Sequence, residues 1–415
     1  VYKNMKKKSF PSFLVCFILL VCSQTALFAE TIEEKWPNGK TSKKYTTDDE
    51  NKKSGTYTEY HENGTSKIKA FYKKDLLEGF YAEFTEDGKK RVEGQYAKGL
   101  INGVYRVYEK GVLVRDEIWI NGVLAYPRTI QEINRNLALI PKLKTEFVGD
   151  WPNDFKIERF SKSVEADNIS GMTRLREYRY LCGVPYEDMQ INRKFVAHNL
   201  DAAILLNKLG RLDHTPANPG LPEEVYKSGY AGTSQSNLAG GSRGTTASRS
   251  VDMYMNDSDK SNIDRVGHRR YCISPYMKMT GFGSEGNYSA MWSFDKSREQ
   301  VDDFDYICYP ARGYMPGTHF NSSYAWNVSL NPKLYATPNK ATVNIQISLL
   351  KGTIKSPLKI SYQNIETSGF GINNCIIFKP DSVSTSAKTK YHVLIAGLKD
   401  KKGEDAQIEY YVEFF

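Results

Sequence analysis

A repeat with a period of 24 residues constrains the N-terminal part of this chain more than any other feature. Residues 55–78 and 79–102 align without a gap, and a third copy that starts at Gly103 is one residue shorter in its turn. In each copy, alternating residues flank a central glycine, which predicts two strands joined by a turn. One hairpin of this size cannot bury its aromatic face, so we expect the copies to stack into an elongated sheet.

The recurring positions of the repeat are glycine and aromatic residues. They are Gly55, Gly79 and Gly103, then Tyr57, Tyr81 and Tyr105, then Tyr60, Phe84 and Tyr108, then Gly64, Gly88 and Gly111, with strand ends at Tyr72, Tyr96 and Trp119. A degraded earlier copy begins near residues 36–39. The pattern resembles MORN-type repeats over residues 30–126. That resemblance implies a spacer or an interaction surface and nothing catalytic.

The first 29 residues have the features of an export signal. Lysines at positions 6–8 precede an apolar run over residues 13–22, and small or neutral residues end near Ala29. About a dozen apolar residues are fewer than the roughly 20 that a spanning helix needs, so we expect cleavage before Glu30 rather than a retained membrane anchor. A lipid anchor on Cys22 is the second alternative. The expected location is the cell envelope, periplasmic or surface, or the extracellular medium.

The charge and the cysteines exclude some classes of function. The formal charge of the whole chain is +9. The first 29 residues contain four lysines and no acidic residue, so the expected mature chain has a formal charge of +5. Basic and acidic residues are interspersed, so no nucleic-acid partner is predicted. The expected mature chain retains Cys182, Cys272, Cys308 and Cys375, without a Cys-x-x-Cys pair. Buried thiols and one or two disulfides both remain open, and three full pairings are possible.

Two further segments follow the repeats. Apolar residues at 191, 195, 202, 205, 206 and 209 share one helical face, and Gly210 can end that helix. A shorter helix is predicted around residues 251–255, and residues 127–164 are expected to be a helical linker. Beyond residue 331, alternating β-formers at near-regular spacing predict a β-sandwich over residues 311–415, with the last strand paired inside it.

Four passages between these segments occur together. They are RLREYRYLCGVP at 174–185, LDHTP at 212–216, SNLAGG at 236–241, and VGHRRYCISP followed by TGFG between 266 and 283. Together they resemble the CAP superfamily, which includes SCP and pathogenesis-related proteins, in its bacterial Gly-His-Arg-Arg form. The resemblance covers residues 165–310 and implies an α-β-α sandwich with a central cleft. The expected fold class is therefore multi-domain α+β, with hairpin repeats, a CAP sandwich and a C-terminal β-sandwich.

The resemblance also implies the residues of the cleft. His214 and His268 match the two family histidines, Asp257 takes the approximate place of one acid, and Ser236 stands where the other acid is expected. Two imidazoles and one carboxylate would suffice for a three-ligand zinc site. Ser236, Asn237, Arg269 and Arg270 are expected to line the cleft. In folded proteins, an arginine in such a position more commonly anchors a buried carboxylate than binds an anionic ligand.

No catalytic residue is assigned from these patterns. Ser236 lacks the Gly-x-Ser-x-Gly frame of a nucleophile elbow, and the glycines at 240–241 and 281–283 are expected to form turns, not phosphate loops. The leading hypothesis is an exported, non-enzymatic protein that binds an envelope glycan, lipid or protein. The alternatives are a metal-dependent hydrolase that uses His214, Asp257 and His268, and a purely structural envelope component. Aromatic residues of the 305–332 connector are expected to pack two domains together.

Overall fold

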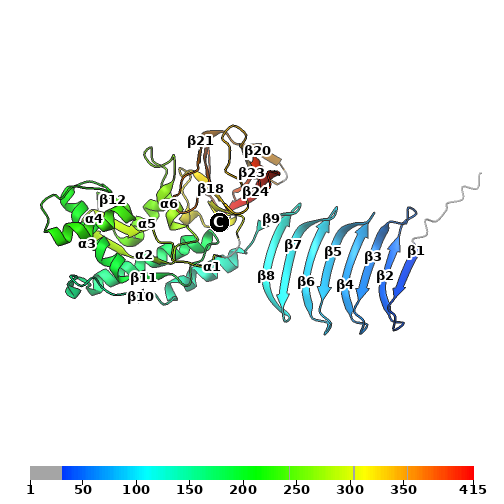
Figure 1. Ribbon diagram of the computed structural model, residues 1–415. Coiled ribbons are helices and arrows are strands. Elements are labelled where there is room, and N and C mark those ends of the chain that lie inside the picture. The colour runs from blue at the N-terminus through cyan, green and yellow to red at the C-terminus, as the bar shows by residue number, and fades with distance from the viewer. Residues whose placement is uncertain (1–29, 243, 302–303, 353) are drawn as a thin grey trace, which may run out of the picture.

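The computed structural model describes residues 30–242, 244–301, 304–352 and 354–415; the predicted export signal and Cys22 lie outside them. An elongated sheet projects from a body of helices and several smaller sheets, so the architecture is mixed α+β and rich in strands (Figure 1). No helix among the described residues combines the length and the apolar character needed to cross a membrane.

The projecting sheet, which we call the ladder, contains nine antiparallel strands in chain order. The strands are β1 (Glu30–Lys35), β2 (Thr41–Thr47), β3 (Lys53–Tyr60), β4 (Ser66–Lys73), β5 (Leu76–Phe84), β6 (Lys90–Ala97), β7 (Leu100–Glu109), β8 (Val112–Ile120) and β9 (Val123–Tyr126). The predicted stack of hairpins is therefore observed. The degraded copy near residues 36–39 forms the turn between β1 and β2.

Large and small side chains alternate across the ladder. Tyr57 lies opposite Ala70, and Tyr81 lies opposite Gly94, so each tyrosine ring has room to lie over the next strand. The ring centroids of Tyr57 and Tyr72 are 5.3 Å apart, in an edge-on arrangement. A Cβ on Gly94 would come within 2.7 Å of the Tyr105 ring. The glycine is therefore required for this packing.

Hydrogen bonds also join successive turns of the ladder. The side-chain Nδ2 of Asn38 donates to the backbone carbonyl of Glu62 at 3.1 Å, and Nδ2 of Asn63 donates to the backbone carbonyl of Glu86 at 3.0 Å. His61 Nε2 donates to the carbonyl of Phe84 at 3.0 Å. These bonds span one repeat each, so every unit fixes the position of the next.

The central unit contains most of the helices and two three-stranded sheets, β10-β11-β13 and β12-β15-β14. Its helices are α1 (Ile130–Leu139), η1 (Ile140–Lys142), η2 (Ile157–Arg159), α2 (Lys162–Leu181), α3 (Arg193–Leu209), α4 (Glu223–Gln235), α5 (Ala247–Asn256) and α6 (Gly267–Cys272). Its strands are β10 (Glu146–Val148), β11 (Gln190–Asn192), β12 (Ser236–Gly240), β13 (Met279–Thr280), β14 (Phe282–Glu285) and β15 (Tyr288–Trp292). The predicted linker over residues 127–164 supplies α1 and β10 to this unit.

Two helix pairs pack on the sheet β12-β15-β14, α2 with α5 and α3 with α4. Phe282 of β14 packs near Gly171 of α2, whereas the next residue, Gly283, approaches the backbone of Asn199 in α3. Because neighbouring residues of a strand point to opposite faces, the two helix pairs cover opposite faces of the sheet. The expectation that residues 281–283 form a turn was wrong, because this segment enters strand β14.

The two predicted helices are present with small differences in their ends. Helix α3 begins at Arg193, where the side chain of Asn192 accepts hydrogen bonds from the next backbone amides, and Gly210 ends it with φ of 73°. Ile191, which was expected in this helix, lies in strand β11. Helix α5 covers residues 247–256 and ends at Asp257, whose φ is 41°.

The C-terminal unit consists of two sheets, β16-β18-β22-β21 and β17-β24-β23-β19-β20. Its elements are β16 (Tyr306–Tyr309), β17 (Gly313–Met315), η3 (Gly317–His319), β18 (Trp326–Leu330), β19 (Asn344–Lys351), β20 (Ile354–Pro357), β21 (Ile360–Glu366), β22 (Cys375–Pro380), β23 (Lys390–Lys399) and β24 (Asp405–Phe414). Trp326 contacts Phe378 in its own sheet and Tyr391 in the other, with ring centroids 6.0 and 5.7 Å away. The final strand is paired on both sides, as predicted.

The boundary between the central and C-terminal units differs from the expected residue 310. Strand β16 pairs with β18, so residues 306–309 belong to the C-terminal sheets. The buried ring of Tyr309 lies 6.1 Å from that of Tyr178 in α2, which places connector aromatics between the two units. Packing, rather than an open aromatic platform, is therefore the role of Tyr309.

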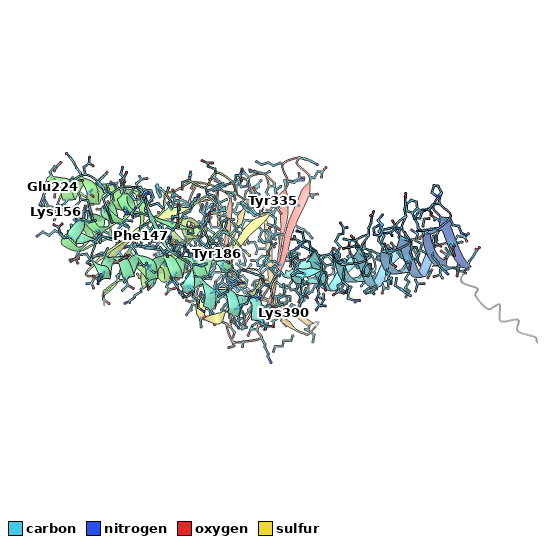
Figure 2. All side chains as sticks on the ribbon, turned by 90° about the horizontal axis from the view of Figure 1, so that it is seen from below. Phe147, Lys156, Tyr186, Glu224, Tyr335 and Lys390 are labelled. Carbon is cyan, nitrogen blue, oxygen red and sulfur yellow. The ribbon has the colours of Figure 1, made fainter. Side chains whose placement is uncertain are left out.

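The ladder joins the body through strand β9. The Tyr126 hydroxyl donates to a Glu413 carboxylate oxygen at 2.6 Å, and Lys390 Nζ lies 3.2 Å from the same oxygen. The Tyr126 ring stacks near Tyr314 with centroids 4.3 Å apart. Lys390 marks this junction in Figure 2, and Glu224 lies at the opposite end of the body.

Candidate functional site

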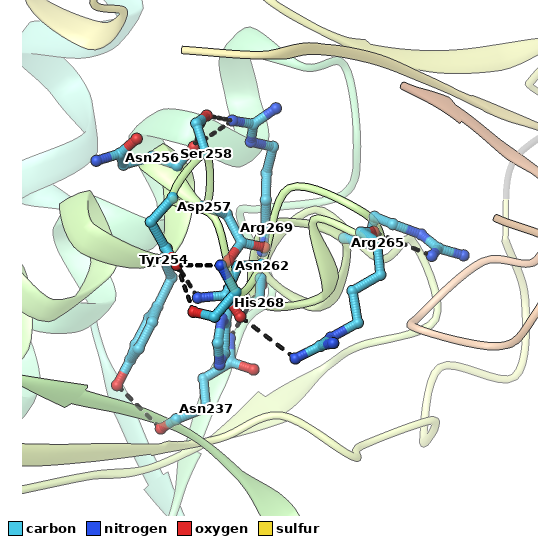
Figure 3. Close-up of polar contacts among 12 residues, drawn as sticks. Asn237, Tyr254, Asn256, Asp257, Ser258, Asn262, Arg265, His268 and Arg269 are labelled. Atoms are coloured by element: carbon cyan, nitrogen blue, oxygen red, sulfur yellow. Dashed lines mark hydrogen bonds and ion pairs between the residues drawn. The ribbon is translucent and has the colours of Figure 1, made fainter. Parts of the chain in front are cut away.

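A cavity of about 410 Å³ lies where the loop before α4, strand β12, helix α5 and helix α6 meet. His214, Asp257 and His268 all line it, together with Tyr254 and Arg265. Figure 3 shows the part of this region that contains Tyr254, Asp257, Arg265 and His268. Three larger hollows have volumes of about 910, 690 and 500 Å³. The residues described around the first two include no histidine, and the third is lined by one, His198. The cavity of about 410 Å³ is lined by two histidines, which makes it the stronger candidate site.

Asp257 fixes the imidazole of His268 from behind. Nδ1 of His268 donates to Oδ1 of Asp257 at 2.9 Å, and the second carboxylate oxygen accepts the backbone N–H of Arg269 at 3.2 Å. Asp257 is 3% exposed. A carboxylate that holds Nδ1–H in this way sets the tautomer and leaves Nε2 of the neutral ring as an acceptor. Asp257 therefore positions His268 and keeps its own oxygens occupied.

His214 is held in the same tautomer by a different partner. Its Nδ1 lies 2.8 Å from the carbonyl oxygen of Thr233, which only accepts hydrogen bonds. The Thr233 hydroxyl in turn donates to the carbonyl of His214 at 3.2 Å. Nδ1 must therefore carry the proton, and Nε2 of the neutral ring is an acceptor. Two imidazoles that both carry their proton on Nδ1 thus line one cavity.

The predicted three-ligand zinc set is not assembled. Within the described part of the chain, no three His, Cys, Asp or Glu side chains are grouped closely enough to hold a metal ion. Both oxygens of Asp257 are engaged by His268 and Arg269, so this carboxylate supports a histidine instead of completing a ligand set. Of the three predicted ligands, His214 and His268 keep an atom of metal-ligand character, Nε2, because only their Nδ1 atoms are engaged in hydrogen bonds among the described residues.

Ser236 and Asn237 stand behind the cavity, contrary to the expectation that they line it. The Ser236 hydroxyl donates to Oδ1 of Asn199 at 2.7 Å, and both residues are buried. The Asn237 side chain donates to the carbonyl of His268 at 3.0 Å, while its backbone carbonyl accepts the hydroxyl of Tyr254 at 2.9 Å (Figure 3). Asn237 therefore joins β12 to α5 and α6, and Ser236 is directed into the core.

Arg269 and Arg270 are also buried, at 0% and 1% exposure, so the expectation that they line the cleft is corrected. The Arg269 guanidinium donates to the carbonyls of Met255 at 2.8 Å and Ala325 at 2.7 Å. Burial lowers the pKa of Arg269 below its usual value. Arg270 donates to the carbonyl of Ser368 at 2.8 Å. Both arginines tie the central unit to the C-terminal sheets.

Sequence reasoning missed Arg265, which lines the cavity three residues before His268. Its side chain donates weakly to Oδ1 of Asn262 at 3.4 Å, and no ion pair recorded among the described residues involves it. Its position beside the Gly-His-Arg-Arg passage is the only signal that could have indicated it. Arg265, unlike Arg269 and Arg270, is the cation at the cavity wall.

The four cysteines of the described residues are free thiols. Burial raises the pKa of Cys182, Cys272, Cys308 and Cys375, which favours inert, protonated thiols. Of the two alternatives that the sequence left open, the structure has free thiols and not disulfides; Cys272, Cys308 and Cys375 are buried, and Cys182 is partly buried. Cys272 accepts a long contact of 3.7 Å from the Asn237 amide and so supports the wall of the site.

Comparison with known families found no family model that matches this chain, and a search of curated proteins found no matching relative.

Proposed function

We propose that this chain is an exported CAP-type binding protein that presents its histidine cavity at the cell envelope or outside the cell. One observation carries the proposal: Ser236, the serine considered as a nucleophile, is directed away from the cavity that His214, Asp257 and His268 line. Ser236 donates into the core, and Asp257 is fully engaged behind His268. The cavity wall therefore offers hydrogen-bonding groups for a ligand without an activated nucleophile.

Several features of the architecture support the CAP-type interpretation. The passages LDHTP, SNLAGG and VGHRR, far apart in sequence, contribute His214, Leu238 and His268 to one cavity. Two helix pairs on opposite faces of one sheet agree with the family's α-β-α sandwich. On this proposal the ladder is a MORN-type spacer or interaction surface, and the C-terminal sheets form a β-sandwich. Residues 1–29 would direct export.

The test compares the purified full chain with the double variant His214→Ala/His268→Ala. Both proteins are prepared without added metal or affinity histidines and are assayed with chromogenic esters and peptides. We expect no turnover that depends on the two histidines, together with folding that the substitutions leave intact. Histidine-dependent turnover would overturn the proposal and favour an enzyme.

A metal-dependent hydrolase is the second candidate, because one cavity holds two tautomer-fixed imidazoles whose acceptor nitrogens are of the kind that binds zinc. His214 and His268 would hold the ion, and Asp257 would orient one ligand from behind. A bound divalent ion would supply Lewis acidity and an activated water. Elemental analysis of the same two proteins tests this: about one ion per chain, lost in the double variant, favours the hydrolase.

A further inference from the structure

We propose that the cavity binds a carbohydrate chain, and that a neighbouring sugar ring of the same chain stacks on an aromatic shelf formed by Tyr271, Phe294 and Phe370. This inference rests on the proposed binding function and names its ligand class. It follows from the geometry of the shelf, from the continuity between shelf and cavity, and from the hydrogen-bonding character of the cavity wall.

The shelf combines three segments. Tyr271 of α6 stacks on Phe294, which follows β15, with ring centroids 4.8 Å apart and planes 27° from parallel. Phe370 of the C-terminal unit meets Tyr271 edge-on at 6.0 Å. It packs on Gly267, where a Cβ would come within 2.8 Å of its ring. Phe294 remains 46% exposed, so a stacked aromatic pair faces solvent.

The shelf and the cavity adjoin. His268 and Tyr271 lie three residues apart on α6, which places their side chains on the same side of the helix. Arg265 lines the cavity, and its guanidinium carbon lies 5.9 Å from the centre of the Phe370 ring. Figure 3 shows Arg265 and His268 among the cavity residues. One ligand of several rings would thus contact imidazole, guanidinium and aromatic surface in turn.

The cavity wall presents both hydrogen-bond acceptors and a donor. The two histidines present acceptor nitrogens and Arg265 presents a guanidinium, whereas the carboxylates of Asp213 and Asp259, which also line the wall, are hydrogen-bonded to neighbouring residues of the chain. An acyl chain would leave the imidazoles and the guanidinium without partners, at a free-energy cost. Leu238 and Met253 add apolar surface. Sugar rings carry both required features, because their hydroxyls donate and their C–H faces stack on aromatic rings.

The experiment titrates the full-length protein with the hexasaccharides of N-acetylglucosamine and of glucose, both β-1,4-linked, by calorimetry. We expect saturable binding of at least one of them below about 1 mM. Phe294→Ala should weaken that binding by about tenfold, the equivalent of losing roughly 1.4 kcal/mol. Phe71→Ala is the matched control, since Phe71 is a ladder phenylalanine with 43% exposure. It should leave the affinity unchanged.

His214→Ala provides a second readout at the other end of the proposed site, and we expect it to weaken the same binding. Absence of saturable binding by either hexasaccharide would overturn the inference, as would equal affinities of the Phe294→Ala and Phe71→Ala proteins. Histidine-dependent binding of a fatty acid or a peptide in place of the sugars would also overturn it, while leaving the proposed binding function intact. Histidine-dependent cleavage of the hexasaccharides would have the reverse meaning, because it would refute the non-enzymatic function and retain the ligand class.

Discussion

Asp257 accepts a 2.9 Å hydrogen bond from Nδ1 of His268, and this contact joins the end of one helix to a cavity-lining imidazole of another. Asp257 terminates α5 in the left-handed conformation, with φ of 41°. Its second oxygen receives the backbone N–H of Arg269 in α6. The carboxylate is thus fixed by the local geometry of two helix ends, and it determines which nitrogen of His268 faces the cavity.

Asp257→Asn should release His268 from its fixed tautomer. Asparagine tolerates the left-handed backbone, so the helix end is retained. The amide has one oxygen for two donors, however, and its NH₂ must face either His268 or Arg269. We expect the Nδ1–H fraction of His268 to fall in nitrogen-detected NMR spectra.

Asp213→Asn is the control for this prediction, because Asp213 lines the same cavity but pairs with Arg211. It should leave the His268 tautomer unchanged. An identical Nδ1–H fraction in wild type and Asp257→Asn would contradict the positioning role that the structure gives to Asp257.

Features with local causes were predictable from the sequence. The ladder follows from alternation and turn glycines within each 24-residue copy, and the C-terminal end of α3 follows from Gly210. Each of these signals acts over a few residues, so a linear pattern contains it. Local patterns also predicted α5 and the pairing of the last strand. The start of α3 at the Asn192 cap was not predicted, since Ile191 was expected inside the helix. The resemblance to the CAP superfamily, and not a local pattern, predicted that His214 and His268 lie in one cleft.

Features with distant causes were not predictable. Arg269 was expected at the cleft edge, yet its partners include the carbonyl of Ala325, 56 residues along the chain. Gly283 was expected in a turn, but it pairs with Ala290 in the sheet, and helix α3 approaches its backbone closely. Nothing within a few residues of either position reports the packing partner. The direction of the Asp257 carboxylate also has a distant cause, because its partners His268 and Arg269 lie at the start of another helix, α6.

Arg269→Met should destabilise the protein strongly. The substitution removes donors from the buried carbonyls of Met255 and Ala325 and leaves those acceptors unpaired, which costs about 1–3 kcal/mol for each group. We expect the free energy of unfolding in urea to fall by about 3 kcal/mol or more. Arg265→Met changes the nearby exposed arginine and should cost less than about 0.5 kcal/mol. Equal losses for the two variants would contradict the role of Arg269.

Gly283→Ala tests the close approach of β14 and α3. A Cβ at this position would lie 2.1 Å from the backbone carbonyl of Asn199, so the helix or the strand must move. Overpacking of this kind costs about 1–3 kcal/mol, and we expect a loss at the upper end because both contacts are backbone atoms. Gly241→Ala is the control, since its nearest neighbour is the Thr245 hydroxyl at 3.4 Å. Thermal unfolding of both variants distinguishes a specific clash from a general effect of alanine.

Glu93 should make the ladder sensitive to acid. Its pKa is lowered to about 2 by hydrogen bonds from Lys90 and then Tyr108, against the opposing effect of burial, with a further contribution from Arg106. A carboxyl whose pKa is lower in the folded state stabilises that state above its unfolded value of 4.5 and loses this effect as the pH falls toward 2. Glu93→Gln should therefore lower the unfolding temperature at about pH 7, and the difference from wild type should shrink between about pH 4.5 and pH 2. Glu86→Gln, at an exposed turn of the same ladder, serves as the control. A difference between Glu93→Gln and wild type that stays constant across this pH range would show that lost packing, and not the charge of Glu93, causes the effect.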